Sequence, residues 1–421
     1  MNLPEMVRVK QNIETPEISD IALAVSSELE RIDLPRLLRP GMQVAVAVGS
    51  RGISNLPIFI RSIVGECRKL QAVPFVIPAM GSHGGATAEG QRRVLASLGV
   101  TELAIGCPIV AKMDVVEIGK TREGIPVVID KSAAEADGII IFNRIKEHTD
   151  FRGALGSGLM KMLTIGLGKC EGATCYHKWA FDLGYYKVVS SVARTVMSNA
   201  RILLGMGVVE NSDNRSAYLV AVKPENLEAV EEEYLAKSKS ISLKLPAESI
   251  DILIVDKLGK EISGSGMDSN VIGRNDIGNE PPPTTPRITR IVARDLTEET
   301  HGNAVGLGMA DFITRRLAKK VNFNETYINA IVGFSPQQGR LPIVAETDLE
   351  AIQWALGTIG RRGARDARVV WIRSTADLKE LLISNPLFWE LQGKSTIEVL
   401  SQAAEMKFDE WGNLEEGFPT S

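Results

Sequence analysis

The sequence is poor in cysteine and contains no long apolar run. Its 421 residues include 4 cysteines, which form no CxxC pair and no spacing typical of a disulfide framework, so a reducing compartment is expected. No uninterrupted apolar stretch approaches the roughly 18 residues that a membrane helix requires. The first residues, Met1–Glu5, lack the basic and apolar regions of a secretory signal. We therefore expect a cytoplasmic protein with no membrane partner.

Several familiar catalytic and binding motifs are also absent. The chain has no HExxH, no Cys/His cluster with zinc spacing, no EF-hand loop and no GxxxxGK[ST]. Residues 153–158 match a dinucleotide-binding fingerprint only loosely, and Ser157 is not part of a GxSxG motif. The formal net charge of -4 gives no electrostatic reason to expect a nucleic-acid partner. Chemistry must therefore be sought in other patterns.

Length and composition predict two α/β domains. The hydrophobic content of 44% and the charged content of 24% are ordinary for a globular protein, and 421 residues can form two cores. Short β-branched runs at 44–48 and 73–77 are each followed by a loop and then by apolar residues at helical spacing. Two such units in succession predict parallel strands with right-handed crossovers. A second α/β region begins at 250–255.

The domain boundary is expected after a charged helical segment, residues 225–244, at Leu245–Pro246. We therefore predict an N-terminal domain over residues 1–246 and a C-terminal domain over residues 247–421, both of the α/β class with largely parallel sheets. Further patterns predict a hairpin over 114–130, one long helix over 179–197 and a helix over 304–319.

Four histidines are the first candidates for chemistry. His83, His148, His177 and His301 lie in Gly-rich or turn-like surroundings rather than inside apolar runs. A lone histidine is more often a passenger, but three of these follow or adjoin strands whose carboxyl ends would align. Imidazole titrates near neutrality, and its neutral form is a common nickel or zinc ligand. Two histidines beside one carbon would form an acid/base pair that inverts a stereocentre, and another would hold a metal.

The stretch from Asn143 to His177 is the strongest candidate for a site. It follows an apolar run, residues 139–142, that is expected to form a buried strand, and α/β proteins place their chemistry in loops after strands. The Gly-rich surroundings of Ser157 suggest backbone N–H groups that approach an anionic group. Lys161 would then be a phosphate clamp, a covalent anchor or a solvated residue. We interpret the stretch as the holder of a metal-bearing cofactor.

These residues resemble the lactate racemase family, whose members use a nickel-pincer nucleotide. The matching features follow one another in order over most of the chain. The strongest is an SGxxK segment that ends at Lys161 and is followed sixteen residues later by His177. The others are Val44–Gly52, Gly81–His83, Ile145–His148, Gly259–Lys260, Gly339–Ile343 and Asp348.

The resemblance implies a role for each matched residue. Lys161 would carry the nickel-pincer nucleotide as a thioamide, with cofactor contacts from Ser157 and Gly158, and His177 would ligate the nickel. His83 and His148 would be the paired acid/base residues. A planar bidentate donor suits a carboxylate, so Arg51 would orient the substrate, and Lys260 would contact it from the second domain.

The implied activity is that of an isomerase, a racemase or epimerase of 2-hydroxy acids. One histidine would deprotonate the substrate hydroxyl while a hydride passes from Cα to the cofactor, and the hydride would return to the other face of the planar keto acid. The substrate would lie in a cleft between the two domains, whose closure excludes water. The expected partners are a small hydroxy acid and the cofactor-synthesis proteins that load the enzyme.

The sequence departs from the family where the substrate would be held. Family members commonly have an aspartate and Thr-Arg-Pro around the arginine, where this chain has Val48–Gly52, and an Arg-Pro after the first histidine, where it has Gly84–Gly85. These departures favour a substrate larger than lactate, such as a sugar acid. The residues expected to contact such a substrate are Asp268, Asn270 and His301.

Two other functions are compatible with the same residues. One is an NAD-linked oxidoreductase or a dehydratase of hydroxy acids that uses the same histidines. The other is a non-catalytic ligand-binding homologue that has lost its grip on the substrate. The joint retention of the arginine, both acid/base histidines and the lysine–histidine pair favours the racemase or epimerase.

Overall fold

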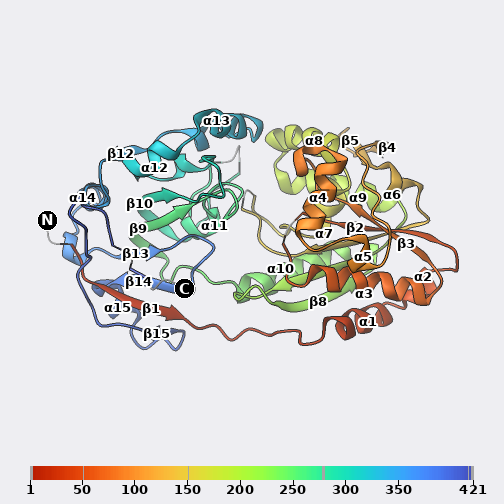
Figure 1. Ribbon diagram of the computed structural model, residues 1–421, viewed down its shortest axis with the longest axis horizontal. Coiled ribbons are helices and arrows are strands. Elements are labelled where there is room, and N and C mark those ends of the chain that lie inside the picture. The colour runs from red at the N-terminus through yellow and green to blue at the C-terminus, as the bar shows by residue number, and fades with distance from the viewer. Residues whose placement is uncertain (1–2, 51, 150, 277–279, 416, 419–421) are drawn as a thin grey trace. The chain divides into compact units, whose positions relative to one another are not determined.

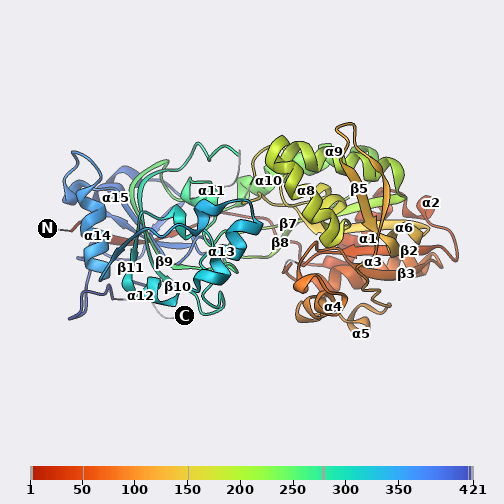
Figure 2. The same cartoon turned by 90° about the horizontal axis from the view of Figure 1, so that it is seen from above.

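A computed structural model describes residues 3–50, 52–149, 151–276, 280–415 and 417–418 of the chain (Figures 1 and 2). The chain divides into two compact units. The first unit is Thr15–Ser242, and the second unit combines Met1–Glu14 with Leu243–Ser421. No helix in the described part of the chain is both long and apolar enough to cross a membrane.

The first unit is built on a five-stranded sheet with the order β3-β2-β6-β7-β8. Its first four strands are parallel, and only β8 runs antiparallel to its neighbour. The prediction of a largely parallel α/β sheet is therefore confirmed. The strands are β2 (Gln43–Val48), β3 (Val73–Pro78), β6 (Gly138–Arg144), β7 (Ile202–Glu210) and β8 (Ser216–Val222).

Helices cover both faces of this sheet, because its central strands are apolar on both sides. On β2, the valines at 44, 46 and 48 face a core shared with α1 and α3, whereas Ala45 and Ala47 face a second core shared with α8 and α9. The small alanines leave room for the second helical layer. These covering helices are α1 (Ile21–Arg31), α3 (Leu56–Lys69), α8 (Lys169–Leu183) and α9 (Tyr185–Asn199).

The helical segment that sequence spacing predicts as one helix over 179–197 is two helices. Helix α8 ends at Leu183 and α9 begins at Tyr185, and between them Gly184 has a φ of 80°, which a helix cannot continue. The prediction of a single helix is therefore wrong. The remaining elements of the first unit are α2 (Leu34–Leu37), α4 (Ala88–Ser97), α5 (Glu102–Ile105), the hairpin β4 (Val115–Lys120) and β5 (Pro126–Asp130), α6 (Lys131–Glu135), α7 (Leu159–Lys161) and α10 (Leu227–Ile241).

The second unit is built on an eight-stranded sheet with the order β12-β11-β10-β9-β13-β14-β1-β15. The pairs from β12 to β13 are parallel, and those from β13 to β15 are antiparallel. The strands are β1 (Met6–Gln11), β9 (Ser249–Leu258), β10 (Arg287–Leu296), β11 (Phe312–Thr314), β12 (Ile343–Ala345), β13 (Val369–Ile372), β14 (Glu380–Ser384) and β15 (Ile397–Val399).

The first fourteen residues join the second unit rather than the first. The sequence predicts one boundary, at 246/247, whereas the compact units divide at 14/15 and at 242/243. Strand β1 pairs with β14 on one side and β15 on the other. Val7 and Val9 of this strand are buried in the core of the second unit. The chain therefore begins in the second unit, forms the first unit and then returns.

One predicted helix of the second unit, over 304–319, is also wrong. Phe312 and Ile313 are buried and pair with strands on both sides, so the segment contains strand β11 and only then a short helix. The helices of the second unit are α11 (Ser269–Ile272), α12 (Arg315–Lys320), α13 (Phe323–Val332), α14 (Asp348–Gly357) and α15 (Asn385–Leu391).

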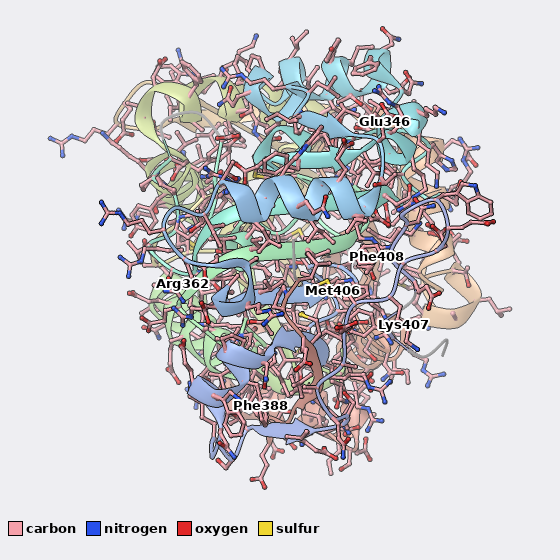
Figure 3. The ribbon with its side chains drawn as sticks, turned by 90° about the vertical axis from the view of Figure 1, so that its left-hand side faces the viewer. Glu346, Arg362, Phe388, Met406, Lys407 and Phe408 are labelled. Carbon is pink, nitrogen blue, oxygen red and sulfur yellow. The ribbon has the colours of Figure 1, made fainter. Side chains whose placement is uncertain are left out.

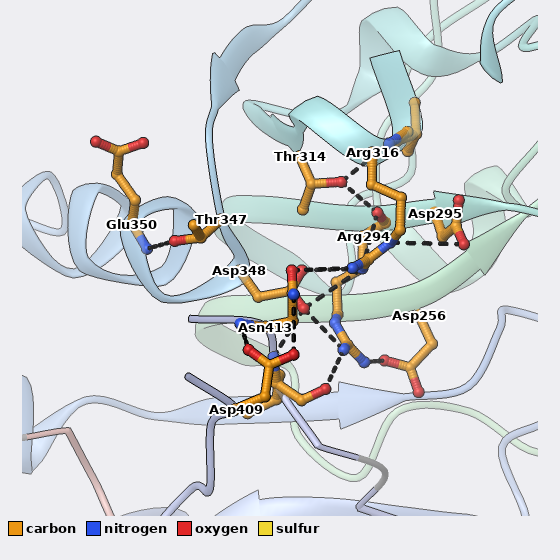
Figure 4. A network of polar contacts seen from close by, with 12 residues as sticks. Asp256, Arg294, Asp295, Thr314, Arg316, Thr347, Asp348, Glu350, Asp409 and Asn413 are labelled. Atoms are coloured by element: carbon orange, nitrogen blue, oxygen red, sulfur yellow. Dashed lines mark hydrogen bonds and ion pairs between the residues drawn. The ribbon is translucent and has the colours of Figure 1, made fainter. Parts of the chain in front are cut away.

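A buried charged network ties the C-terminal segment to this sheet (Figure 4). Arg294 of β10 is ion-paired with Asp256 and donates to Asp348 at 2.9 Å and to the carbonyl of Leu414 at 2.7 Å. Met406 and Phe408, labelled in Figure 3, pack against the core on the same face of the sheet. The C-terminal segment is therefore part of the second unit's fold.

Candidate active site

His83 lies in the loop after β3, and its ring is held by a residue that follows the neighbouring strand. Its Nδ1 is 2.7 Å from the hydroxyl oxygen of Ser50, which comes after β2. Because β2 and β3 are parallel, their carboxyl ends meet at one edge of the sheet. The side chain of His83 is exposed there. Arg51, the predicted substrate-orienting residue, lies outside the described residues.

His148 follows the next strand of the same sheet, β6. Its ring stacks on Phe151 with a centroid distance of 4.2 Å, and its Nε2 contacts the Nζ atom of Lys161. The structure therefore brings together two residues that are 13 positions apart in the sequence. A proton can pass directly between an imidazole and an amine in this arrangement.

Lys161 ends the short helix α7, and a π-helical turn, Met162–Gly166, follows it directly. Such turns are rare and frequently occur at functional sites. The segment before the lysine is tied to the end of β6, because Ser157 exchanges two backbone hydrogen bonds with Lys146, of 2.8 and 2.9 Å. The Asn143 amide also donates to the Gly158 carbonyl at 2.9 Å. The backbone that carries Lys161 is therefore fixed to the central sheet.

A buried carboxylate that the sequence patterns did not single out supports the same segment. Glu231 of α10 is 0% exposed and accepts a 2.7 Å hydrogen bond from the Met160 amide. Burial raises the pKa of its carboxyl to about 7. A Cβ atom at Gly158 would lie 2.3 Å from Glu231 Oε1, which explains the glycine. The sequence does contain a signal that Glu231 is buried, because Leu227, Glu231 and Leu235 follow one another at helical spacing on the apolar face.

His177 projects from α8 and is oriented by the first residue of α9. Its Nδ1 is 2.7 Å from the hydroxyl of Tyr185, and the two rings meet edge to face. Burial and then the positive charge of Lys161 lower the pKa of His177 to about 4. The imidazole is therefore neutral at neutral pH, the form that binds metals.

Aromatic contacts join His148 to His177. Phe151 stacks on His148 on one side and, with a centroid distance of 5.4 Å, on Tyr185 on the other. Tyr185 in turn holds His177. Phe151 and Tyr185 carry no motif in the sequence, so only the fold identifies them. Three predicted site residues, His148, Lys161 and His177, thus lie in one cluster of the first unit.

The loop of His83 packs against the same part of the unit. Gly81 has a φ of +59°, and a Cβ atom there would lie 3.1 Å from Ile165 of the π-helical turn and 3.6 Å from Ala173 of α8. These two elements follow Lys161 and carry His177, respectively. The four predicted residues are therefore held by loops and helices that contact one another.

The side chains of this cluster fit a metal ion whose other ligands come from a cofactor. The described residues contain no group of three or more His, Cys, Asp or Glu side chains able to hold a metal ion. His177 would therefore supply one ligand only. When Tyr185 accepts a hydrogen bond from Nδ1–H, the lone pair of Nε2 is left for the metal. Lys161, whose charge lowers the pKa of His177, would hold a cofactor beside it.

The predicted residues of the second unit are placed as follows. The ammonium of Lys260 contacts the side-chain oxygen of Asn329 on α13. Asp268 caps helix α11 and accepts hydrogen bonds from the backbone and side chain of Asn270, of 2.9 and 3.0 Å. His301 has a left-handed backbone with a φ of 49°. Their contacts with a substrate stay predictions.

Comparison with known proteins shows what this chain is similar to. Residues 2–183 match the family described as "Lactate racemase N-terminal domain", a range that includes the histidines at 83, 148 and 177 and the lysine at 161. No sequence among curated proteins matches the chain.

Two solved structures share the fold. The lactate racemase apoprotein from Thermoanaerobacterium thermosaccharolyticum is 13% identical, with a TM-score of 0.55 over 88% of this chain and 98% of that one. A protein from Thermotoga maritima is 12% identical, with a TM-score of 0.50 over 86% of this chain and 97% of that one.

Proposed function

We propose that the chain, whose residues 2–183 match the lactate racemase N-terminal domain, is a member of this family and an isomerase that inverts C2 of a 2-hydroxy acid. One observation carries the proposal. The family resemblance assigns three different tasks to His148, Lys161 and His177, and these residues lie in one cluster. The fourth residue, His83, lies in a loop that packs against this cluster's helices.

The cluster fits a nickel-pincer nucleotide. His177 would ligate the nickel through Nε2, while Tyr185 fixes its ring, and Lys161 would hold the nucleotide covalently. Ser157 and Gly158 would contact it from the segment before the lysine. When bound, this group supplies a reversible hydride acceptor, which no protein side chain provides.

The chain itself would supply proton transfer and orientation. His148 would take the proton from the substrate hydroxyl, and stacking on Phe151 fixes the plane of its ring. Its Nε2 contacts the amine of Lys161, and that lysine would lose its charge on forming the thioamide, which leaves Nε2 for the substrate. His83, whose Nδ1 is held by Ser50, would present Nε2 as the second acid/base. Arg51 would orient the carboxylate, and Lys260 would add a further contact.

We propose a substrate larger than lactate. The arginine and proline that commonly follow the first histidine in this family are replaced by Gly84 and Gly85. A Cβ atom at Gly84 would lie 2.5 Å from the backbone of Gly90, so this loop passes directly over α4. Because the loop lacks the arginine side chain, it leaves room for a larger substrate. This supports a sugar acid or a hydroxy acid of similar size as the substrate.

The test is proton–deuterium exchange at Cα. Protein produced together with the cofactor-synthesis proteins is offered a panel of hydroxy acids in D2O, and we expect exchange at C2 of at least one of them. His83→Ala and His148→Ala should each slow the exchange by about 10²-fold or more. The protein should also contain nickel and carry a mass increment on Lys161. Nickel-free protein without that increment contradicts the cofactor assignment, and exchange that survives both substitutions contradicts the acid/base assignment.

A further inference from the structure

A fully buried lysine connects the elements that carry the site. Lys169 is 0% exposed, and its Nζ lies 2.8 Å from Oδ2 of Asp130, which is also 0% exposed. A buried ion pair is expensive to desolvate, and apolar residues of similar volume often stabilise a fold at least as well. Its presence therefore calls for a reason other than stability.

The other contacts of the lysine lead to the His83 loop. Its ammonium donates to the carbonyl of Pro78, the last residue of β3, and lies 3.4 Å from the side-chain oxygen of Gln91. Gln91 is itself 0% exposed, and its amide donates to the carbonyl of Gly81 at 2.9 Å and to that of His83 at 3.4 Å. The loop is thus held at its beginning and at His83.

Asp130 anchors the lysine on the opposite side. Its backbone N–H donates to the carbonyl of Leu167 at 2.7 Å, just after the π-helical turn that follows Lys161. Its other carboxylate oxygen caps helix α6 through the amide of Ala133. Lys169 itself has a φ of 55°, a left-handed conformation that is strained for a lysine and tends to persist at functional sites.

We propose that Lys169 is a positioning residue, whose buried ammonium holds the His83 loop against the segment that carries Lys161 and the helix that carries His177. This inference rests on the proposed function, because it assigns the network a task in placing the acid/base residue. His83 is exposed, so its loop receives its position from the buried network beneath it. The lysine does not touch the substrate.

The decisive variant is Gln91→Leu, which removes the hydrogen bonds to the Gly81 and His83 carbonyls and leaves the Lys169–Asp130 pair intact. Hydrogen exchange of the amides of Ala79, His83 and Ala86, which are all hydrogen-bonded in the native loop, should become faster by about tenfold or more. Exchange at the Lys146–Ser157 pair should change by less than about twofold. Gln338→Leu, which alters a buried glutamine of the second unit, is the matched control and should leave the loop unchanged.

Catalysis provides the second readout. In the loaded enzyme, Gln91→Leu should lower kcat for Cα exchange by about tenfold or more with KM nearly unchanged, because a misplaced acid/base slows proton transfer rather than binding. The double variant Lys169→Met/Asp130→Leu should show the same loosened loop and lowered kcat. If it does not fold, Gln91→Leu alone decides.

The outcomes separate this inference from the proposed function. An unchanged loop in Gln91→Leu overturns the positioning role, whether or not the enzyme is active. A loosened loop with unchanged kcat also overturns it. Absence of Cα exchange in the loaded wild-type protein overturns the proposed function, and the loop exchange then still shows whether the network holds His83.

Discussion

Tyr185 determines which nitrogen of His177 can face a metal, because its hydroxyl engages Nδ1. Burial already keeps this imidazole neutral, since its pKa is lowered to about 4. A neutral ring in a fixed orientation is what a metal ligand requires, and partners of such rings contribute to metal affinity. At the scale of single residues, a tyrosine without any sequence motif therefore orients the predicted metal ligand.

Replacing this tyrosine should weaken nickel retention. Tyr185→Phe removes the hydrogen bond to His177 and keeps the ring that stacks on Phe151, so retention should fall by about 10- to 100-fold. Competition with a chelator, followed by metal analysis of the loaded protein, measures the change. Tyr186→Phe alters the exposed neighbour and should retain nickel like the wild type. Equal retention in both variants would show that Tyr185 does not support the ligand.

Glu231 predicts an unusual dependence of stability on pH. Its pKa is raised from 4.5 to about 7 in the folded protein, so the folded state binds the proton more tightly than the unfolded state. The free energy of unfolding should therefore fall as the pH rises through this window, by roughly 3 kcal/mol in total.

Glu231→Gln should remove this contribution. Urea unfolding at a series of pH values across the window measures the difference between the variant and the wild type. Glu232→Gln changes the exposed neighbour on the same helix and should keep the wild-type slope. A wild-type slope in Glu231→Gln would mean that another group titrates.

At the scale of elements, apolar runs were sufficient to predict the central strands and their parallel order. The run at 44–48 is buried throughout, and the run at 73–77 is buried at Pro74, Val76 and Ile77, in paired strands of the first unit's sheet. The break at Gly184 and strand β11 were missed because they depend on backbone conformation and on pairing with distant strands. The grouping of His148, Lys161 and His177 was predicted from the family resemblance. The buried Lys169 was not predicted, because it lies between a glycine and a cysteine and matches no motif.

The close fit between α7 and α10 makes Gly158 sensitive to any side chain. Gly158→Ala would place a Cβ atom 2.3 Å from the Glu231 carboxylate, so we expect a destabilisation of about 2 kcal/mol and a displaced Lys161 segment. Thermal unfolding and hydrogen exchange at Met160 measure both effects. Gly357→Ala, in α14 with open space around it, should not lower the stability and should leave exchange at Met160 unchanged. Wild-type exchange at Met160 in Gly158→Ala would show that the segment can shift without cost.

At the scale of the whole molecule, the first unit contains a complete sheet with both faces covered. Its two larger apolar cores consist of residues 18–230, and a smaller apolar cluster extends to Ile241. All three lie within residues 15–242, as does the cluster of His148, Lys161 and His177. A protein of residues 15–242 should therefore fold alone and keep the contacts of that cluster.

Circular dichroism and a single cooperative thermal transition would confirm such a fold. The matched fragment of residues 243–421 lacks strand β1, which lies between β14 and β15, and should aggregate or unfold. Adding residues 1–14 through a flexible linker should restore it. A stable fold of residues 243–421 by themselves would contradict this prediction.

The placement of β1 also has a consequence for biosynthesis. This strand precedes the whole first unit in the sequence, yet its neighbours β14 and β15 follow that unit. The first unit can fold during translation, since domains generally fold as units in the order of their synthesis. Strand β1 must stay unpaired until β14 and β15 have been made, exposed to chaperones or to other nascent chains. Completion of the second sheet thus requires segments from both sides of the first unit, so a chain that terminates before β14 cannot form it.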